Sequence, residues 1–182
     1  LLSGKNTLFT GSQGLMRRPM QVYEQLCLEK GLTYNADGSS IAVRGPIVSG
    51  EYEVVGNVSS QFISGLIFAL PMLDGDSRIK ITPPIESRSY IDLTIEALSL
   101  FGVKVVWQDD TTLYIKGGQK YTPTDITVEG DYSGAAFIDA FALFAHDVSV
   151  EGLNPESTQV DKIYKTLYYM IKKGVPTIHI GN

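Results

Sequence analysis

The chain has 182 residues, of which 43% are hydrophobic and 19% charged, values typical of a globular protein with one or two domains. Its net charge is -5 and its basic residues form no long run, which argues against a nucleic-acid-binding protein. The longest apolar run, residues 62–73, is too short to span a membrane. Cys27 is the only cysteine, which excludes an intramolecular disulfide and a cysteine-based metal cluster, and we expect a cytoplasmic protein.

The first third of the chain predicts a strand, a turn, a helix and a hairpin. Pro19 suits the first turn of the helix, where its missing N–H costs little, and Gly31 suits the C-terminal cap. Asp37-Gly38 is a strong hairpin signal. The predicted ranges are a strand at residues 6–10, a turn at 11–14, a helix at 16–28, and strands at 32–35 and 40–43.

The middle of the chain predicts two strand–helix pairs followed by a second hairpin. The first helix is almost wholly apolar, whereas the second carries Ile91, Ile95 and Leu98 on one face and stops at Gly102. The predicted ranges are strands at residues 51–55 and 78–82, helices at 60–73 and 89–100, and hairpin strands at 103–107 and 111–116.

The last third repeats the pattern of the middle. An apolar helix is followed by an amphipathic one, which ends at Gly174. Asp131 suits a helix cap better than a catalytic acid. The predicted ranges are strands at residues 126–131, 147–151 and 177–180, and helices at 133–144 and 157–172.

These three rounds form an internal repeat of β-α-β-α-β-β units. The glycines that end the second helix of each round, Gly31, Gly102 and Gly174, are 71 and 72 residues apart, and the strand-to-helix turns at Gly56 and Gly130 are 74 apart. The first round lacks its opening strand and helix. Because the first helix of each unit is apolar all round, we expect pseudo-threefold packing, with buried helices inside and sheets outside, in an α/β (α+β) fold.

The turn after residues 51–55 is the candidate binding site. Its strand ends at Gly56, and Ser59, Ser60 and Gln61 then place side-chain donors at the start of a helix, where unpaired N–H groups and the helix dipole favour an anion. The alternative is that Asn57 or Ser59 only caps a core helix. The equivalent turn after Gly130 lacks the Ser-Gln donors.

Several stretches of the chain resemble the 5-enolpyruvylshikimate-3-phosphate synthase family, also called 3-phosphoshikimate 1-carboxyvinyltransferases. The resemblance runs through essentially the whole chain in the right order. It is carried by residues 56–62 (GNVSSQF), 87–94 (SRSYIDLT), 101–103 (FGV) and 128–131 (VEGD), with Thr10-Gly11 and residues 17–20 (RRPM) similar to a further segment.

The resemblance implies the enolpyruvyl transferase fold, an inside-out α/β barrel in which two domains of three units each close over the substrates. Residues 1–124 would be the latter part of the first domain, and residues 125–182 a partial unit of the second. The chain also begins without a methionine, so we expect a fragment, catalytically inactive alone.

The activity implied is transfer of the enolpyruvyl group from phosphoenolpyruvate to the 5-hydroxyl of shikimate 3-phosphate, in aromatic amino-acid (chorismate) biosynthesis. The family uses no metal and no organic cofactor. These small molecules would be the only partners, with no nucleic acid or membrane, and the full-length protein is expected to be a monomer.

The resemblance also assigns binding residues, while no catalytic residue matches within the chain. Gln61 would contact both substrates, Tyr90 would line the phosphate site, and the Arg18 fork would bind phosphoenolpyruvate. The implied ligands are Ser59, Ser60, Gln61, Ser87 and Tyr90 for shikimate 3-phosphate, and Arg18 and Gln61 for phosphoenolpyruvate.

Each assignment has a structural alternative. Ser87 could only cap the helix that follows it, Tyr90 could pack in the core or rim, and Arg18 could form a solvated pair with Arg17. Ser89 departs from the proline that many family members carry, which puts the geometry around Ser87 in doubt.

Two other functions remain open. A related enolpyruvyl transferase acts on a uridine-diphosphate amino sugar, but it typically uses a loop cysteine, whereas Cys27 lies within a predicted helix. A non-catalytic scaffold of the same fold is the other alternative. Retention of the whole set of shikimate 3-phosphate ligands argues against such a loss of function.

Overall fold

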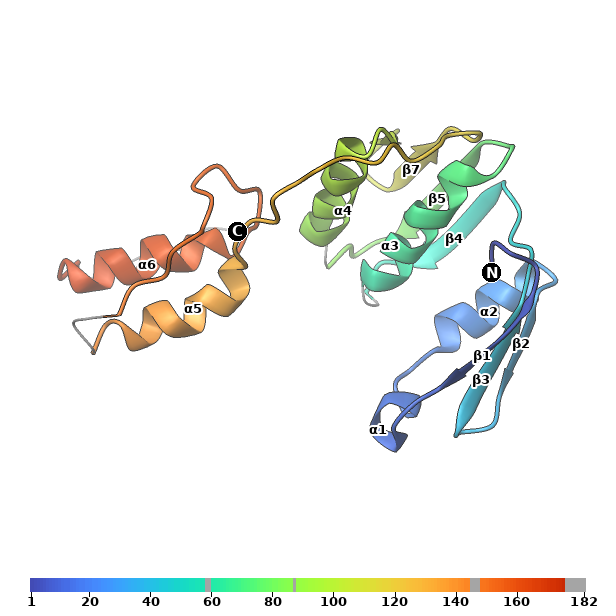
Figure 1. Cartoon of the computed structure of the whole chain (residues 1–182), viewed down its shortest axis with the longest axis horizontal. Helices are drawn as coiled ribbons and strands as arrows, with labels where there is room; N and C mark the ends of the chain where they lie inside the picture. The colour runs from blue at the N-terminus through green and yellow to red at the C-terminus, as the bar shows by residue number, and fades with distance from the viewer. Residues whose placement is uncertain (58–59, 87, 145–147, 176–182) are drawn as a thin grey trace. The chain divides into compact units, whose positions relative to one another are not determined.

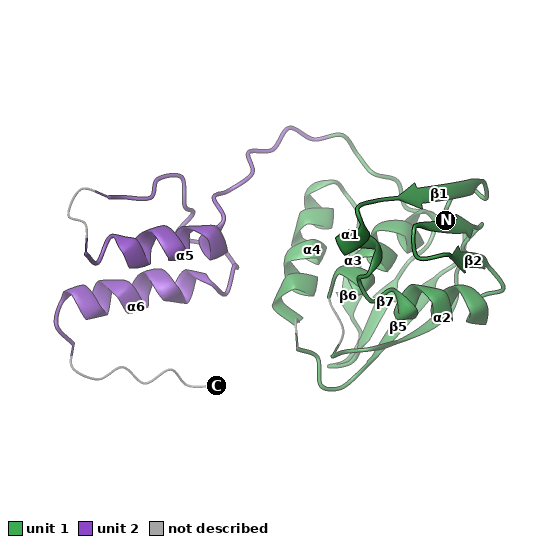
Figure 2. Cartoon of the chain, turned by 90° about the horizontal axis from the view of Figure 1, so that it is seen from below, with its two compact units in different colours: residues 1–123 green, residues 124–182 purple. Residues whose placement is uncertain are grey.

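The computed structural model describes residues 1–57, 60–86, 88–144 and 148–175. The chain divides into two compact units, unit 1 (Leu1–Pro123) and unit 2 (Thr124–Asn182), coloured separately in Figure 2. The predicted strand at residues 177–180 lies outside the described residues. None of the described helices is long and apolar enough to cross a membrane.

Unit 1 contains a four-stranded sheet of order β4-β5-β7-β6, with β4 and β5 parallel and the other pairs antiparallel. Burial alternates along the strands, so one face packs in the core against helices α3 and α4, which lie side by side (Figure 1). The bounds are β4 (Glu51–Val55), β5 (Ser77–Thr82), β6 (Val105–Trp107), β7 (Thr112–Ile115), α3 (Ser60–Ala69) and α4 (Arg88–Leu100).

A second, three-stranded antiparallel sheet of order β1-β3-β2 precedes it, with α2 packed against β2. The predicted hairpin is confirmed: the Asp37 carboxylate accepts hydrogen bonds from the N–H groups of Ser39 at 2.8 Å and Ser40 at 2.6 Å. These bonds hold the pKa of Asp37 well below its ordinary value. The bounds are β1 (Asn6–Thr10), α2 (Gln21–Glu29), β2 (Thr33–Ala36) and β3 (Ser40–Arg44).

The two sheets of unit 1 confirm the repeat. The order β1-β3-β2 matches β5-β7-β6, and the residue pairs Asn6↔Arg44 and Ser77↔Ile115 occupy the same register after a shift of 71 positions on both strands. The four-stranded sheet has β4 as an additional strand, parallel to β5. The partial first repeat and the complete second repeat, both within unit 1, therefore share one strand topology.

The three glycines at the helix ends adopt the same left-handed conformation. Their φ angles are 66° for Gly31, 77° for Gly102 and 74° for Gly174. In each case the next residue's N–H reaches back to a helix carbonyl five residues earlier, in the Schellman arrangement. These bonds join Leu32 to Cys27 at 2.7 Å, Val103 to Leu98 at 3.1 Å, and Val175 to Met170 at 3.2 Å.

The predictions around Pro19 are wrong in detail. The predicted turn at residues 11–14 overlaps a short helix, α1 (Gln13–Met16), whose first turn is capped by the Ser12 hydroxyl. Helix α2 begins only at Gln21, so Pro19 precedes it. A proline disfavours helical backbone at the residue before it, which explains why the helix cannot run through from Met16.

The expectation that the first helix of each unit is buried on all sides is also wrong. Helix α3 ends at Ala69 and continues as a 3₁₀ turn, η1 (Leu70–Met72), at Pro71. The Phe68 side chain remains 49% exposed. Among the described residues, unit 1 and unit 2 each contain one such apolar helix, α3 and α5. The sides of these helices that face away from the core are therefore not covered by an equivalent helix of another repeat.

The described part of unit 2 contains two packed helices, α5 (Tyr132–Phe141) and α6 (Lys162–Lys172). The Asp131 carboxylate caps α5 as predicted, accepting the N–H groups of Ser133 and Gly134 at 3.0 and 2.9 Å. The strands predicted at residues 126–131 and 147–151 do not form in the described part of the chain. In the described part of the chain, the Gly130 N–H donates to the carbonyl of Gly152, the residue after the second of these segments, at 3.0 Å.

The Glu129 carboxylate organises the segment before α6. It accepts hydrogen bonds from Ser157 Oγ at 2.5 Å, Gln159 Nε2 at 2.7 Å and Asn154 Nδ2 at 3.0 Å. These hydrogen bonds, that of Ser157 foremost, lower the pKa of Glu129. The segment that supplies these donors has an irregular backbone, and the helix predicted from residue 157 begins at Lys162.

Glu129→Gln is expected to destabilise unit 2. The carboxylate accepts Ser157 and Gln159 on Oε1 and Asn154 on Oε2, whereas an amide has one oxygen and one NH2 group. In either orientation the NH2 group faces at least one of these donors, at a cost of about 1–3 kcal/mol. Amide hydrogen exchange in α5 and α6 measures this as a lower free energy of opening. The exposed Glu156→Gln makes the same charge change and should alter that free energy by less than about 0.5 kcal/mol. Equal effects of the two variants would contradict the prediction.

The same network predicts an acid-dependent loss of stability. Because the folded-state pKa of Glu129 lies below its ordinary value of 4.5, the carboxylate stabilises unit 2 above that value. This contribution is lost as the pH falls through the folded-state pKa. Opening free energies measured over this range, after correction for intrinsic exchange, should therefore fall less steeply in Glu129→Gln than in the wild type.

Candidate functional site

A close backbone contact joins the ends of β4 and β5. The Gly56 N–H donates to the Thr82 carbonyl at 2.8 Å, and the Gly56 carbonyl accepts the Glu86 N–H at 3.2 Å. A Cβ at Gly56 would lie 2.6 Å from the carbonyl oxygens of both Thr82 and Pro84, so only glycine permits this approach. The contact holds the turn before α3 against the segment before α4.

Side-chain contacts continue this arrangement along α3 and α4. The Thr94 hydroxyl donates to the Tyr90 carbonyl at 2.8 Å. The hydroxyls of Ser64 and Thr94 are 2.9 Å apart, and because the Thr94 proton is already engaged, Ser64 is the donor. The two helices are thus fixed side by side, with their first turns at the same end.

Helix α2 starts at this end as well. Tyr23 lies in the first turn of α2, and Phe62 lies in the first turn of α3. The centres of their rings are 4.5 Å apart, in an edge-to-face contact. Figure 1 shows α2 and α3 running side by side from this end. The N-termini of α3 and α4 therefore lie together at one end of unit 1, and their unpaired N–H groups and positive dipole ends favour an anion. Helix α2 starts nearby but carries Glu24 in its first turn.

Three of the predicted ligands lie on these first turns. Ser60 is the first residue of α3 and half-buried, Gln61 follows it and is exposed, and Tyr90, the third residue of α4, is 48% exposed. Ser59 and Ser87 lie outside the described residues. The roles of all five as ligands stay predictions.

Arg18 lies in the connection between α1 and α2, five residues before Tyr23. Its side chain is exposed and borders a cavity of about 160 Å³ beside β2 and β3. Within the described part of the chain, its guanidinium forms no hydrogen bond or ion pair, which leaves the planar fork available to a carboxylate or phosphate. Its binding of phosphoenolpyruvate also stays a prediction.

Sequence reasoning gave no role to Arg88, although it lies between two predicted ligands. Its guanidinium carbon is 4.0 Å from the centre of the Trp107 ring, and its Nη1 donates to the Asp110 carbonyl at 2.8 Å. Trp107 Nε1 in turn donates to Asp92 Oδ1 at 2.7 Å. The basic residue at the start of α4 was the available sequence signal, but its partner on the distant hairpin could not be inferred.

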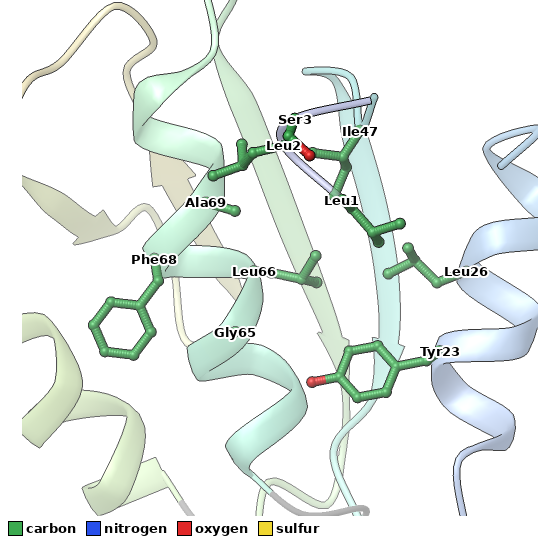
Figure 3. A pocket seen from close by; sticks show the side chains of 10 residues that line it. All are labelled: Leu1, Leu2, Ser3, Tyr23, Leu26, Ile47, Gly65, Leu66, Phe68 and Ala69. Atoms are coloured by element: carbon green, nitrogen blue, oxygen red, sulfur yellow. The ribbon is translucent and has the colours of Figure 1, made fainter. Parts of the chain in front are cut away.

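A larger pocket of about 490 Å³ lies along the second half of α3, away from the starts of α3 and α4 (Figure 3). Leu26 and Leu66 line it, and Figure 3 shows the Tyr23 hydroxyl directed toward α3 beside Gly65. Burial raises the pKa of Tyr23, which keeps its phenol neutral. Among the side chains lining the pocket, only Ser3 and Tyr23 are polar and none is cationic, so it does not suit a polyanion.

The fold is that of the enolpyruvyl transferases. Two solved structures of EPSP synthase from Acinetobacter baumannii are similar to this chain, with TM-scores of 0.58 and 0.59. At 21% and 23% sequence identity, they cover 77% and 78% of this chain and 32% and 33% of their own chains.

The chain belongs to the EPSP synthase (3-phosphoshikimate 1-carboxyvinyltransferase) family, whose model matches residues 1–176. The 3-phosphoshikimate 1-carboxyvinyltransferase of Clostridium kluyveri is 40% identical over 88% of this chain, and that of Clostridium novyi is 39% identical over 100%. These matches cover 38% and 41% of the relatives. The chain thus spans about two-fifths of the length of these relatives.

Gly56→Ala is expected to destabilise unit 1 by about 1–3 kcal/mol, because its methyl group would collide with two backbone carbonyls. Trp107, the only tryptophan, lies in unit 1, so its fluorescence during urea unfolding measures the loss. Gly14→Ala, at a helical position with open space around the new Cβ, should be neutral or slightly stabilising. Unchanged stability of Gly56→Ala would show that the turn tolerates separation from β5.

Proposed function

We propose that the protein containing this chain transfers the enolpyruvyl group of phosphoenolpyruvate to the 5-hydroxyl of shikimate 3-phosphate, with release of phosphate. The observation that carries this proposal is the family match over residues 1–176. The adjacent N-termini of α3 and α4 support it, because both substrates are polyanions and neither helix has an acidic residue in its first turn.

The proposed phosphate site lies at the starts of α3 and α4. Ser60 and the first backbone N–H groups of these helices bind the phosphate of shikimate 3-phosphate, and Tyr90 lines the same site. Gln61 reaches both the shikimate ring and the pyruvyl group. Ser59 and Ser87 join these ligands on the sequence evidence alone. Arg18 engages phosphoenolpyruvate through two parallel hydrogen bonds.

The two compact units correspond, in this proposal, to parts of the two family domains. Residues 1–124 form the latter part of the first domain, and residues 125–182 a partial unit of the second; the division at Pro123 supports this boundary.

No metal or organic cofactor takes part in the proposed reaction. We also propose that the full-length protein works as a monomer in the cytoplasm, where the free, buried thiol of Cys27 stays reduced.

Ser60→Ala tests the phosphate site. Loss of a hydrogen bond to a charged group should weaken binding of shikimate 3-phosphate roughly tenfold, measured by isothermal titration of the 182-residue chain. Ser133→Ala, in the equivalent turn of unit 2, is the matched control and should bind like the wild type. If Ser60→Ala keeps wild-type affinity, the assignment of this turn to phosphate is wrong.

The isolated chain is expected to give no turnover with both substrates. Proton transfer and charge stabilisation require catalytic groups positioned around the substrates, and none is assigned within this chain. Phosphate release should equal the rate without protein, while the Clostridium kluyveri relative serves as the positive control. Enolpyruvyl transfer by the chain alone would place catalytic residues within it.

A further inference from the structure

Two successive turns of α4 hold the ring of Trp107. The Arg88 guanidinium lies over its face at 4.0 Å, and Asp92, four residues later and one turn along the helix, accepts its Nε1–H at 2.7 Å. The Arg88 hydrogen bond to the Asp110 carbonyl, at 2.8 Å, adds a third link. This cluster, Arg88–Asp92–Trp107–Asp110, attaches the first turn of α4 to the β6–β7 hairpin.

The position of Arg88 is electrostatically unusual. A cation at the first residue of a helix adds to the positive end of the dipole, which is unfavourable in the absence of an anion. No carboxylate forms a salt bridge with its guanidinium among the described residues, since the hydrogen bond goes to a neutral carbonyl. The guanidinium thus has no direct ion-pair partner among the described residues, and the carboxylate of its cluster, Asp92, bonds to Trp107 instead. This positive charge lies at the start of α4, where the phosphate of the proposed substrate is expected.

We propose that Arg88 is a positioning residue for the phosphate site: stacked on Trp107, it fixes the first turn of α4 and supplies positive charge there without contacting the substrate. This inference rests on the proposed function of that site. It assigns Trp107, some twenty residues away in sequence, an indirect part in substrate affinity. Because Trp107 is the only tryptophan, its fluorescence also reports on the cluster when the site is occupied.

Titration of shikimate 3-phosphate into the 182-residue chain, by calorimetry and by Trp107 fluorescence, tests this inference. Arg88→Met keeps much of the side-chain length but removes the charge and the hydrogen bond, and should weaken binding roughly three- to fivefold. Arg88→Lys keeps the charge and the cation–π contact and should restore most of the affinity. Trp107→Phe keeps a ring for stacking and should bind more tightly than Trp107→Leu.

Salt dependence and stability separate this role from a purely structural one. If the charge of Arg88 acts on the bound phosphate, the difference between wild type and Arg88→Met should shrink between low salt and 0.5 M sodium chloride. Far-UV circular dichroism and urea unfolding identify any variant that is merely misfolded. If Arg88→Met or Trp107→Leu is misfolded, the affinities of Arg88→Lys and Trp107→Phe, which keep a cation stacked on an aromatic ring, decide whether Arg88 positions the phosphate site.

The possible outcomes distinguish this inference from the proposed function. Weaker binding by Ser60→Ala but wild-type binding by folded Arg88→Met would overturn the role of Arg88 and leave the phosphate site standing. Weaker, salt-sensitive binding by Arg88→Met with rescue by lysine supports the inference, even if Ser60→Ala binds normally and the Ser60 assignment fails. No binding by the wild type would overturn both the assignment of the phosphate site to the starts of α3 and α4 and the role of Arg88 there.

Discussion

The arrangement of unit 1 depends on how closely the chain at Gly56 approaches the end of β5. Two backbone hydrogen bonds, to Thr82 and from Glu86, leave no space for a side chain between them. Because β4 and β5 are parallel, each leads into a helix from the same edge of the sheet. A close contact at this edge therefore brings two helix starts together, the position at which open α/β sheets generally bind ligands.

The equivalent turn in unit 2 shows why the shared fold does not make two equal sites. The Gly130 N–H also bonds to the chain opposite it, at Gly152. However, the start of α5 already carries a carboxylate, since Asp131 accepts two of its first N–H groups. That negative charge satisfies the helix end and would repel an anion, whereas α3 begins with the neutral pair Ser60 and Gln61.

Local patterns predicted the features of the fold that depend on short stretches of sequence. Periodicity and glycine spacing identified the repeat, whose helix ends at Gly31, Gly102 and Gly174 all have the same conformation. Features that depend on distant partners were missed. The strand predicted at residues 126–131 has the right composition, but a strand requires a ladder partner, and composition carries no information about whether one is in place.

The residues of the candidate site likewise include some that could be predicted from local sequence and one, Arg88, that could not. Serine and glutamine at a helix start can be recognised locally, because capping and anion binding act through the nearest backbone groups. The orientation of Arg88 could not be recognised, since it depends on Trp107 and Asp110, which are brought near only by the β6–β7 hairpin. In a chain with a net charge of -5, a local positive site depends on such placement more than on composition. A basic side chain held on an aromatic ring at a helix start, beside first turns without carboxylates, provides that local charge.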